Sequence, residues 1–202
     1  MPAPRVYRLV YKFVPRLAYR SLARAISRLS SEVRVGLDVG AGVGLAAELI
    51  AHRFDRLYLL DVEEDMLREA LRRLSHLKNV VILRGDARSI PLRDESVDLV
   101  YFFDSLHHIE GWEKALAEAL RVLRPGGVLA IFDMVGSSPV SRLLSWVERR
   151  AGLYSELPGV EGLIEFIEEH CDEVAARTDI LGRLDLIAIK SSERRIGVQP
   201  SS

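Results

Sequence analysis

From residue 33 onward, short apolar runs alternate with stretches in which apolar residues recur every three or four positions. The first pattern predicts strands and the second predicts helices. The predicted strands are 33–39, 56–61, 79–84, 97–103 and 127–133, and the predicted helices between them are 43–53, 63–76 and 110–123. The strands show little alternation, which is typical of burial on both faces. The order of elements therefore predicts a parallel sheet with crossover helices.

The pattern becomes less regular after Asp133. Helices are predicted at 138–151 and 160–170, followed by strands at 173–180 and 184–190. A connection of only three or four residues, through Gly182 and Arg183, joins these last strands. Because so short a connection cannot cross back over a sheet, the two strands are predicted to be antiparallel.

Proline, glycine and basic residues mark the remaining boundaries. The segment Arg124-Pro125-Gly126-Gly127 is predicted to end the preceding helix and turn the chain. Residues 5–30 combine basic residues at helical spacing with an apolar side, and Pro15 is expected to kink or divide this helix. We expect a basic amphipathic segment at 1–30, one domain at 31–190 with a substrate-side helical segment at 134–172, and a flexible tail at 191–202.

Composition narrows the class of protein. Of the 202 residues, 49 % are hydrophobic and 28 % charged, which is ordinary for a globular chain. The lone Cys171 cannot form an internal disulfide, and the five histidines show no structural zinc pattern. The sequence shows neither an apolar run long enough to span a bilayer nor a secretory signal, so we expect a cytoplasmic location. The scarcity of Asn and Gln fits a thermophilic source.

The net charge of −1 conceals an uneven distribution. Residues 1–30 contain seven basic residues and no acidic residue, so the rest of the chain is acidic. Tyrosines lie among these basic residues, which leaves open binding to an anionic membrane surface or to nucleic acid. A solvated helix face explains the same pattern. The sequence does not indicate an oligomeric state.

The strongest local signal is a glycine-rich turn after the first predicted strand, in the segment Leu37-Asp38-Val39-Gly40-Ala41-Gly42-Val43-Gly44. Glycines there allow the backbone to approach a ligand closely. A nicotinamide fingerprint would require glycine at position 45, where the chain has Leu45. Asp38 would also repel a pyrophosphate, and it favours a cationic or amine-bearing ligand.

Acidic residues follow the next three strands as well. Asp61 can accept hydrogen bonds from both hydroxyls of a ribose, although such a residue is also a common helix N-cap. Asp86, after Gly85, can accept from an adenine amine, or it can simply belong to a turn. The fourth strand ends in Phe103-Asp104-Ser105-Leu106-His107-His108. Ligands of open α/β sheets bind at this carboxyl edge.

Together these segments resemble the class I S-adenosylmethionine-dependent methyltransferases, most closely the small type 11 branch that includes quinone-biosynthesis C-methyltransferases. The resemblance covers about residues 33–190. The segments that carry it are LDVGAGVG, LLDVEEDML, GDARSIPLRDESVDLVYFFDSLHHI and LRVLRPGGVLAIFD. It implies a three-layer Rossmann-like α/β fold whose mostly parallel seven-stranded sheet has the order 3-2-1-4-5-7-6, with strand seven antiparallel.

The resemblance also implies a site for S-adenosylmethionine, with S-adenosylhomocysteine as product. Gly40, Ala41 and Gly42 would cradle the methionine part, and Asp38 would lie near its amino group. Asp61 would hold the ribose. The remaining implied contacts are Val62 and Met66 on the adenine faces, Gly85, Asp86 and Ala87 at its edge, and Phe103, Asp104 and Ser105 on the methionine side.

Methyl transfer requires mainly proximity and orientation, and a general base helps only where the acceptor loses a proton. His107 and His108 are the candidates for that base or for acceptor contacts, with Asp133 and Tyr101 as weaker alternatives. The sequence offers no further ligands for a metal at the paired histidines, so none is expected. A helical segment after the fifth strand can supply an apolar lid or a core stripe; its candidate residues are Leu143, Leu144, Trp146, Leu153 and Tyr154.

We therefore predict methyl transfer to a small-molecule acceptor, aromatic or lipid-like. RNA or protein methylation is the alternative, although the sequence lacks the N/D-P-P-Y/F pattern of amino-directed base methyltransferases. A non-catalytic S-adenosylmethionine-binding protein and a nicotinamide-dependent oxidoreductase are further alternatives. The acceptor and the methylated atom are not encoded in any recognisable motif.

Overall fold

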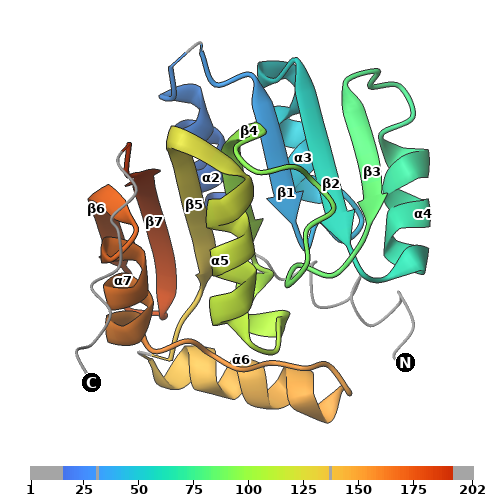
Figure 1. Ribbon diagram of the computed structural model, residues 1–202. Helices are drawn as coiled ribbons and strands as arrows, with labels where there is room; N and C mark the ends of the chain where they lie inside the picture. Colours follow the sequence, from blue (N-terminus) through green and yellow to red (C-terminus); the bar gives the residue numbers. More distant parts are fainter. Residues whose placement is uncertain (1–15, 31, 137, 193–202) are drawn as a thin grey trace.

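A seven-stranded sheet forms the centre of the protein (Figure 1), in a computed structural model that describes residues 16–30, 32–136 and 138–192. The strands are β1 (Val35–Val39), β2 (Arg56–Asp61), β3 (Val80–Arg84), β4 (Val97–Phe103), β5 (Leu123–Met134), β6 (Cys171–Thr178) and β7 (Arg183–Lys190). Their order is β3-β2-β1-β4-β5-β7-β6. Because β7 pairs antiparallel with both neighbours, the predicted topology is confirmed.

Helices cover both faces of this sheet. They are α2 (Arg16–Ser27), α3 (Leu45–Ile50), α4 (Glu64–Arg73), α5 (Trp112–Val122), α6 (Pro139–Arg150) and α7 (Val160–Glu168), with short 3-10 helices η1 (Ala51–Arg53) and η2 (Leu106–His108). One core cluster joins α2, α3 and part of α4 to the sheet, and the other joins α5 and α7 to its opposite face. The three-layer arrangement follows from these two apolar clusters.

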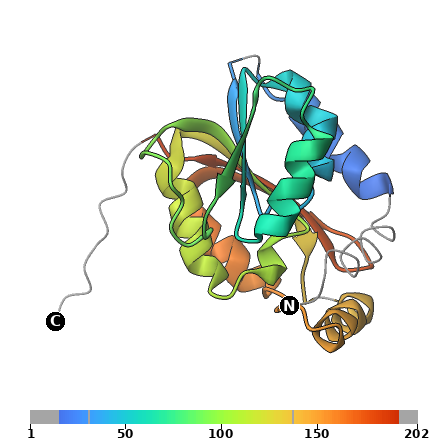
Figure 2. The same cartoon turned by 90° about the vertical axis from the view of Figure 1, so that its right-hand side faces the viewer.

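The helix α6 differs from the other helices in its position. It lies across the end of the sheet at which the parallel strands finish (Figure 1), and Figure 2 shows it apart from both helical layers. None of the helices in residues 16–30, 32–136 and 138–192 is long and apolar enough to cross a membrane.

Most predicted elements are confirmed, with three differences. The expected burial of every strand on both faces is wrong for β3, whose residues are half-buried because it forms an edge of the sheet. The turn predicted at 124–127 lies within β5. There the pairing of β5 with β4 is irregular, because the register shifts between Leu123 and Val128. The first predicted helix is confirmed from Arg16; residues 5–15, including Pro15, lie outside the described residues.

The parallel register brings the ends of β1, β2, β3 and β4 to one edge of the sheet. Val39 at the end of β1 pairs with Leu60 on one side and with Phe102 on the other. The strand order reverses between β1 and β4, so their following loops diverge to opposite faces. This divergence opens a crevice at the carboxyl edge, which is where open α/β sheets bind ligands.

Candidate functional site

The turn between β1 and α3 depends on glycine. Gly40, Gly42 and Gly44 all have positive φ angles, at 73°, 53° and 78°. A Cβ atom added at Gly40 would lie 2.5 Å from the Cβ of Ser105, a distance that neither side chain can relieve without moving backbone. Glycine at this position therefore lets the turn after β1 press directly against the segment after β4.

Asp38 lies beneath this turn, and its side chain is only 1 % exposed. Its Oδ2 atom has no hydrogen-bond partner among the residues that the structure describes. Burial raises the pKa of the Asp38 carboxyl to about 7, although the neighbouring Tyr101 side chain acts in the opposite direction. A buried carboxylate with an unused acceptor is suited to a cationic or hydrogen-bond-donating partner.

A small pocket connects Asp38 to the surface, lined by the glycine turn and by Tyr19 and Phe103. Tyr19 comes from α2, and its ring centroid lies 4.9 Å from that of Phe103. Burial raises the pKa of the Tyr19 hydroxyl to about 12, so it is protonated at neutral pH. α2 therefore covers the end of the site that contains Asp38.

Asp61, at the end of β2, connects that strand to the glycine turn. Its Oδ2 accepts a hydrogen bond of 2.7 Å from the backbone N–H of Gly42, and its Oδ1 accepts one of 2.9 Å from that of Glu63. Burial raises the pKa of Asp61, and hydrogen bonds from the backbone of Glu63, Gly42 and Val62 oppose that rise. The N-cap interpretation is wrong, because Glu63 is the N-cap of α4. These bonds fix the direction of the carboxylate.

A larger cavity of about 490 Å³ runs along the carboxyl edge of the sheet. The structure brings together all the predicted cofactor residues at the two pockets. Those lining the larger cavity are Gly40, Gly42, Asp61, Val62, Met66, Gly85, Asp86, Ala87, Asp104 and Ser105. Those lining only the smaller pocket are Asp38, Ala41 and Phe103. The larger volume is typical of a site for a nucleotide-sized ligand.

Two arginines that the sequence analysis did not single out pair with predicted site residues. Arg88 Nη2 lies 2.7 Å from Asp86 Oδ2, and its hydrogen bonds lower the pKa of the Asp86 carboxyl. Arg183 of β7 lies 3.0 Å from Asp104 Oδ1. Burial nevertheless raises the pKa of Asp104 to about 6. The first pair is two residues apart in sequence, whereas nothing local in the sequence predicts the second.

Asp104 also has an uncommon backbone conformation. Its φ angle is 48°, in the left-handed region that non-glycine residues rarely adopt. Its backbone N–H donates to the carbonyl of Phe132 at 2.9 Å, so β5 supports the turn. Strained residues of this kind gather at ligand sites, where the surrounding structure holds them in place.

The two candidate histidines occupy different environments. His107 is buried, and its Nδ1 bonds to Asp133, while His108 lines the cavity and its Nδ1 lies 2.6 Å from the carbonyl oxygen of Tyr154. Burial alone would lower the pKa of His107, but Asp133 and then Glu148 raise it to about 10. Burial and the adjacent His107 lower the pKa of His108 to about 4. The two carboxylates thus favour the charged form of His107, whereas burial and the adjacent His107 favour the neutral form of His108.

The weaker base candidates are engaged elsewhere. Asp133 accepts backbone hydrogen bonds from Ser105 and Leu106, at 3.1 and 2.6 Å. Tyr101 is fully buried within β4, and burial raises the pKa of its hydroxyl well above the usual value. Of these candidates, the structure places only His108 on the wall of the larger cavity.

The expectations for α6 require correction. Leu143, Leu144 and Trp146 are 60 %, 46 % and 49 % exposed, so they form neither a lid nor a core stripe. The buried face of α6 is instead polar, with Ser141, Ser145 and Glu148. The Ser155 hydroxyl donates a hydrogen bond of 2.8 Å to Glu148, and its oxygen also lies 2.8 Å from the hydroxyl oxygen of Ser145, which explains this orientation. Leu153 and Tyr154 do line the larger cavity.

The central part of the chain is similar to known methyltransferases. Residues 37–131 match a family model described as a methyltransferase domain. Over 88 residues, 43 % of this chain, the sequence is 38 % identical to a malonyl-acyl-carrier-protein O-methyltransferase of Methylococcus capsulatus, 32 % of which is covered. Over 105 residues, 50 % of this chain, it is 34 % identical to a demethylmenaquinone methyltransferase of Thermobifida fusca, 44 % of which is covered. The matches thus span less than half of either relative.

Solved structures share the fold over a larger part of the chain. A phosphoethanolamine N-methyltransferase of Haemonchus contortus, in complex with phosphomonomethylethanolamine and S-adenosylhomocysteine, superposes with a TM-score of 0.71 and 18 % identity. The match covers 86 % of this chain and 52 % of that one. At this identity the likeness shows the Rossmann-like fold of the domain.

Proposed function

We propose that the chain is a class I S-adenosylmethionine-dependent methyltransferase, which transfers a methyl group from S-adenosylmethionine to a small apolar acceptor. The observation that carries the proposal is the position of Asp38 and Asp61. One carboxylate lies under a glycine turn in the smaller pocket, and the other lies at the next strand end on the larger cavity. S-adenosylmethionine carries an amino group and a ribose that such a pair can bind.

We assign the amino group of the methionine part to the smaller pocket. Asp38 Oδ2 is buried and has no partner in the described part of the chain, so an ammonium group would satisfy it. Gly40 leaves no room for a side chain, which keeps the backbone close to the ligand. Tyr19 and Phe103 cover this end, and we assign them the exclusion of water.

The ribose and adenine fit the larger cavity. Asp61 uses one lone pair of each oxygen for a backbone N–H, which leaves acceptor capacity for two ribose hydroxyls. Val62 is 60 % exposed at the cavity, whereas Met66 is buried, so the two offer apolar contacts for an adenine ring. Because Arg88 already occupies much of the Asp86 carboxylate, Asp86 offers the adenine amine only its remaining lone pairs.

The acceptor is assigned to the end of the larger cavity formed by His108, Leu153 and Tyr154. When bound, S-adenosylmethionine supplies a methyl group on a cationic sulfur that is already activated for in-line displacement. The residues of this chain then have to align the acceptor and exclude water, and the reaction requires little else from the protein. We assign His108 an acceptor contact, and His107 a positioning role through Asp133.

An apolar acceptor is supported by this lining and by two of the relatives. Leu153 and the Tyr154 ring present apolar surface beside His108. The related proteins include a demethylmenaquinone methyltransferase and a phthiotriol and phenolphthiotriol dimycocerosate methyltransferase, whose names describe apolar molecules. A small aromatic or lipid-like acceptor therefore suits the site better than a nucleic acid.

Incubation of the purified chain with methyl-labelled S-adenosylmethionine and a panel of quinols, phenols and acyl carriers tests the proposal. We expect one acceptor class to be labelled with matching release of S-adenosylhomocysteine, and Asp61→Ala to abolish most of that turnover. Binding of S-adenosylmethionine without labelling of any acceptor class, small molecule, RNA or protein, would instead indicate a non-catalytic binding protein.

A further inference from the structure

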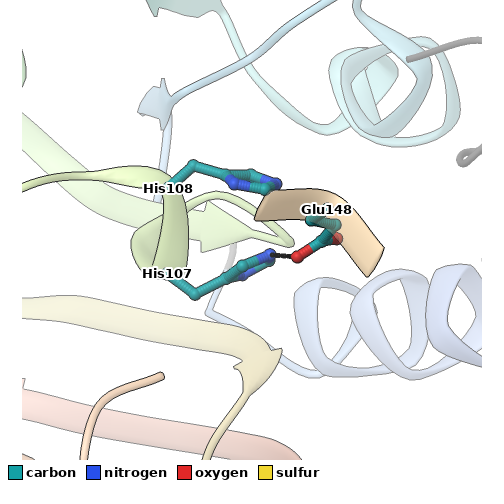
Figure 3. Close-up of side chains that lie close together, drawn as sticks. All are labelled: His107, His108 and Glu148. Atoms are coloured by element: carbon teal, nitrogen blue, oxygen red, sulfur yellow. Dashed lines mark ion pairs between the residues drawn. The ribbon is translucent and has the colours of Figure 1, made fainter. Parts of the chain in front are cut away.

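Two histidines and a glutamate meet beside the larger cavity (Figure 3). His107 and His108 come from η2 and Glu148 comes from α6, 40 residues further along the chain. Each offers one ligand atom, and these atoms lie within 4.8 Å of one another. Because α6 turns a polar face inward, Glu148 is buried toward the histidines rather than toward solvent.

The histidine rings are oriented by acceptors on their other nitrogen. Nδ1 of His107 bonds to Asp133, and Nδ1 of His108 lies 2.6 Å from the carbonyl oxygen of Tyr154. Metal-binding histidines are usually oriented in this way, by an acceptor on the ring nitrogen that does not bind the metal. The Glu148 carboxylate is similarly oriented by the hydroxyl of Ser155 at 2.8 Å.

The gap between these groups is too wide for a hydrogen bond. His107 Nε2 lies 3.6 Å from Glu148 Oε2, and it has no hydrogen-bond partner among residues 16–30, 32–136 and 138–192 (Figure 3). The two groups form a buried ion pair across this gap, and a metal ion that displaces the His107 proton can bind between them. The possible ligand atoms of His107, His108 and Glu148 surround that gap.

We propose that His107, His108 and Glu148 bind a divalent transition-metal ion such as Zn²⁺ or Co²⁺. Two imidazole nitrogens and one carboxylate oxygen are ligands that such ions prefer, and three protein ligands leave a coordination position open. His108 lines the larger cavity, so that position faces the end assigned to the acceptor. The inference concerns metal binding alone and stands whether or not the chain transfers methyl groups.

Absorption spectroscopy with Co²⁺ tests the site directly. The full chain is stripped with a chelator, the chelator is removed, and Co²⁺ is added while the visible bands of the bound ion are recorded. We expect one Co²⁺ per chain and displacement of the bands by Zn²⁺. Glu148→Gln and His108→Gln should each weaken binding by at least about tenfold, because each removes a ligand.

His170→Gln is the matched control, since His170 lies at the end of α7 and bonds to the carbonyl of Phe166. It should leave the bands and the affinity unchanged. Circular dichroism of each variant verifies the fold. The proposal is wrong if the folded chain gives no bands, or if both ligand variants bind Co²⁺ as the unaltered chain does. In that case His107 serves only as a buried cation between Asp133 and Glu148.

Discussion

At the scale of single residues, the carboxyl group of Asp38 links burial to ligand binding. Burial raises its pKa to about 7, so near neutral pH about half of the free chains carry a protonated Asp38. An ammonium ligand binds the ionised form, and binding must therefore release that proton at lower pH. Tyr101 and Asp61 are the other titratable groups that influence Asp38.

We therefore predict that the affinity for S-adenosylmethionine falls as the pH drops from about 7 to about 5.5, a range in which an α-amino group stays mostly protonated. In Asp38→Asn the affinity should be weaker throughout and nearly independent of pH. Calorimetric titrations at several pH values measure both. Asp55→Asn, an exposed residue paired with Arg34, is the control. If the affinity of Asp38→Asn depends on pH as strongly as that of the unaltered chain, the proton belongs to another group.

The glycine turn gives a second prediction. Gly40→Ala and Gly42→Ala both place a side chain at positive φ, at a cost of about 1–2 kcal/mol. Only the Gly40 substitution adds a clash, because the new Cβ lies 2.5 Å from Ser105 Cβ, whereas at Gly42 it meets no described atom within 4 Å. We expect urea unfolding to show a larger loss of stability for Gly40→Ala, by a further 1–3 kcal/mol or so. Equal losses would contradict this account of the turn.

The residues that could be found in the sequence were those that follow a strand. Asp38, Asp61 and Asp86 each stand at or after the end of an apolar run, and parallel strands bring such ends together. Partners such as Arg183 and Glu148 could not be found. Arg183 meets Asp104 across 79 residues of chain, and only the tertiary packing of β7 creates that contact.

At the scale of elements, α6 shows why periodicity predicts a helix more reliably than its orientation. Its apolar residues recur at helical spacing, which normally marks the buried face. Here the polar face is buried instead, because Ser145 and Glu148 hydrogen bond to Ser155 and Glu148 also approaches His107. Leaving those polar groups without hydrogen bonds in the interior would cost free energy, so their bonds determine which face of the helix is buried.

The exposed apolar face of α6 should contribute little to stability. We predict that Leu143→Gln changes the free energy of unfolding by no more than about 0.5 kcal/mol. Leu163→Ala in α7, at a fully buried position, should cost about 2–5 kcal/mol. Denaturant unfolding of the two variants compares them directly. A large loss for Leu143→Gln would show that this face of α6 is packed in solution.

At the scale of the whole molecule, most strands and helices were predictable because each βαβ unit has its own apolar strand, helix and turn signals. The order of the strands in the sheet was expected from the resemblance to a known family. The short connection between the last two strands then fixed their antiparallel pairing. The edge position of β3 was not visible, since a strand's burial depends on which neighbours cover it. Acceptor identity was also hidden, because the residues around that end of the cavity belong to the least regular part of the sequence.

The central claim is that the two pockets together bind S-adenosylmethionine. Calorimetric titration of the purified chain with S-adenosylmethionine, S-adenosylhomocysteine and NADH tests it most directly. We predict micromolar binding of the first two and none of NADH, with a loss of about 1–3 kcal/mol of binding free energy in Asp61→Ala. Binding of NADH alone, or unchanged affinity in a folded Asp61→Ala variant, would contradict the account.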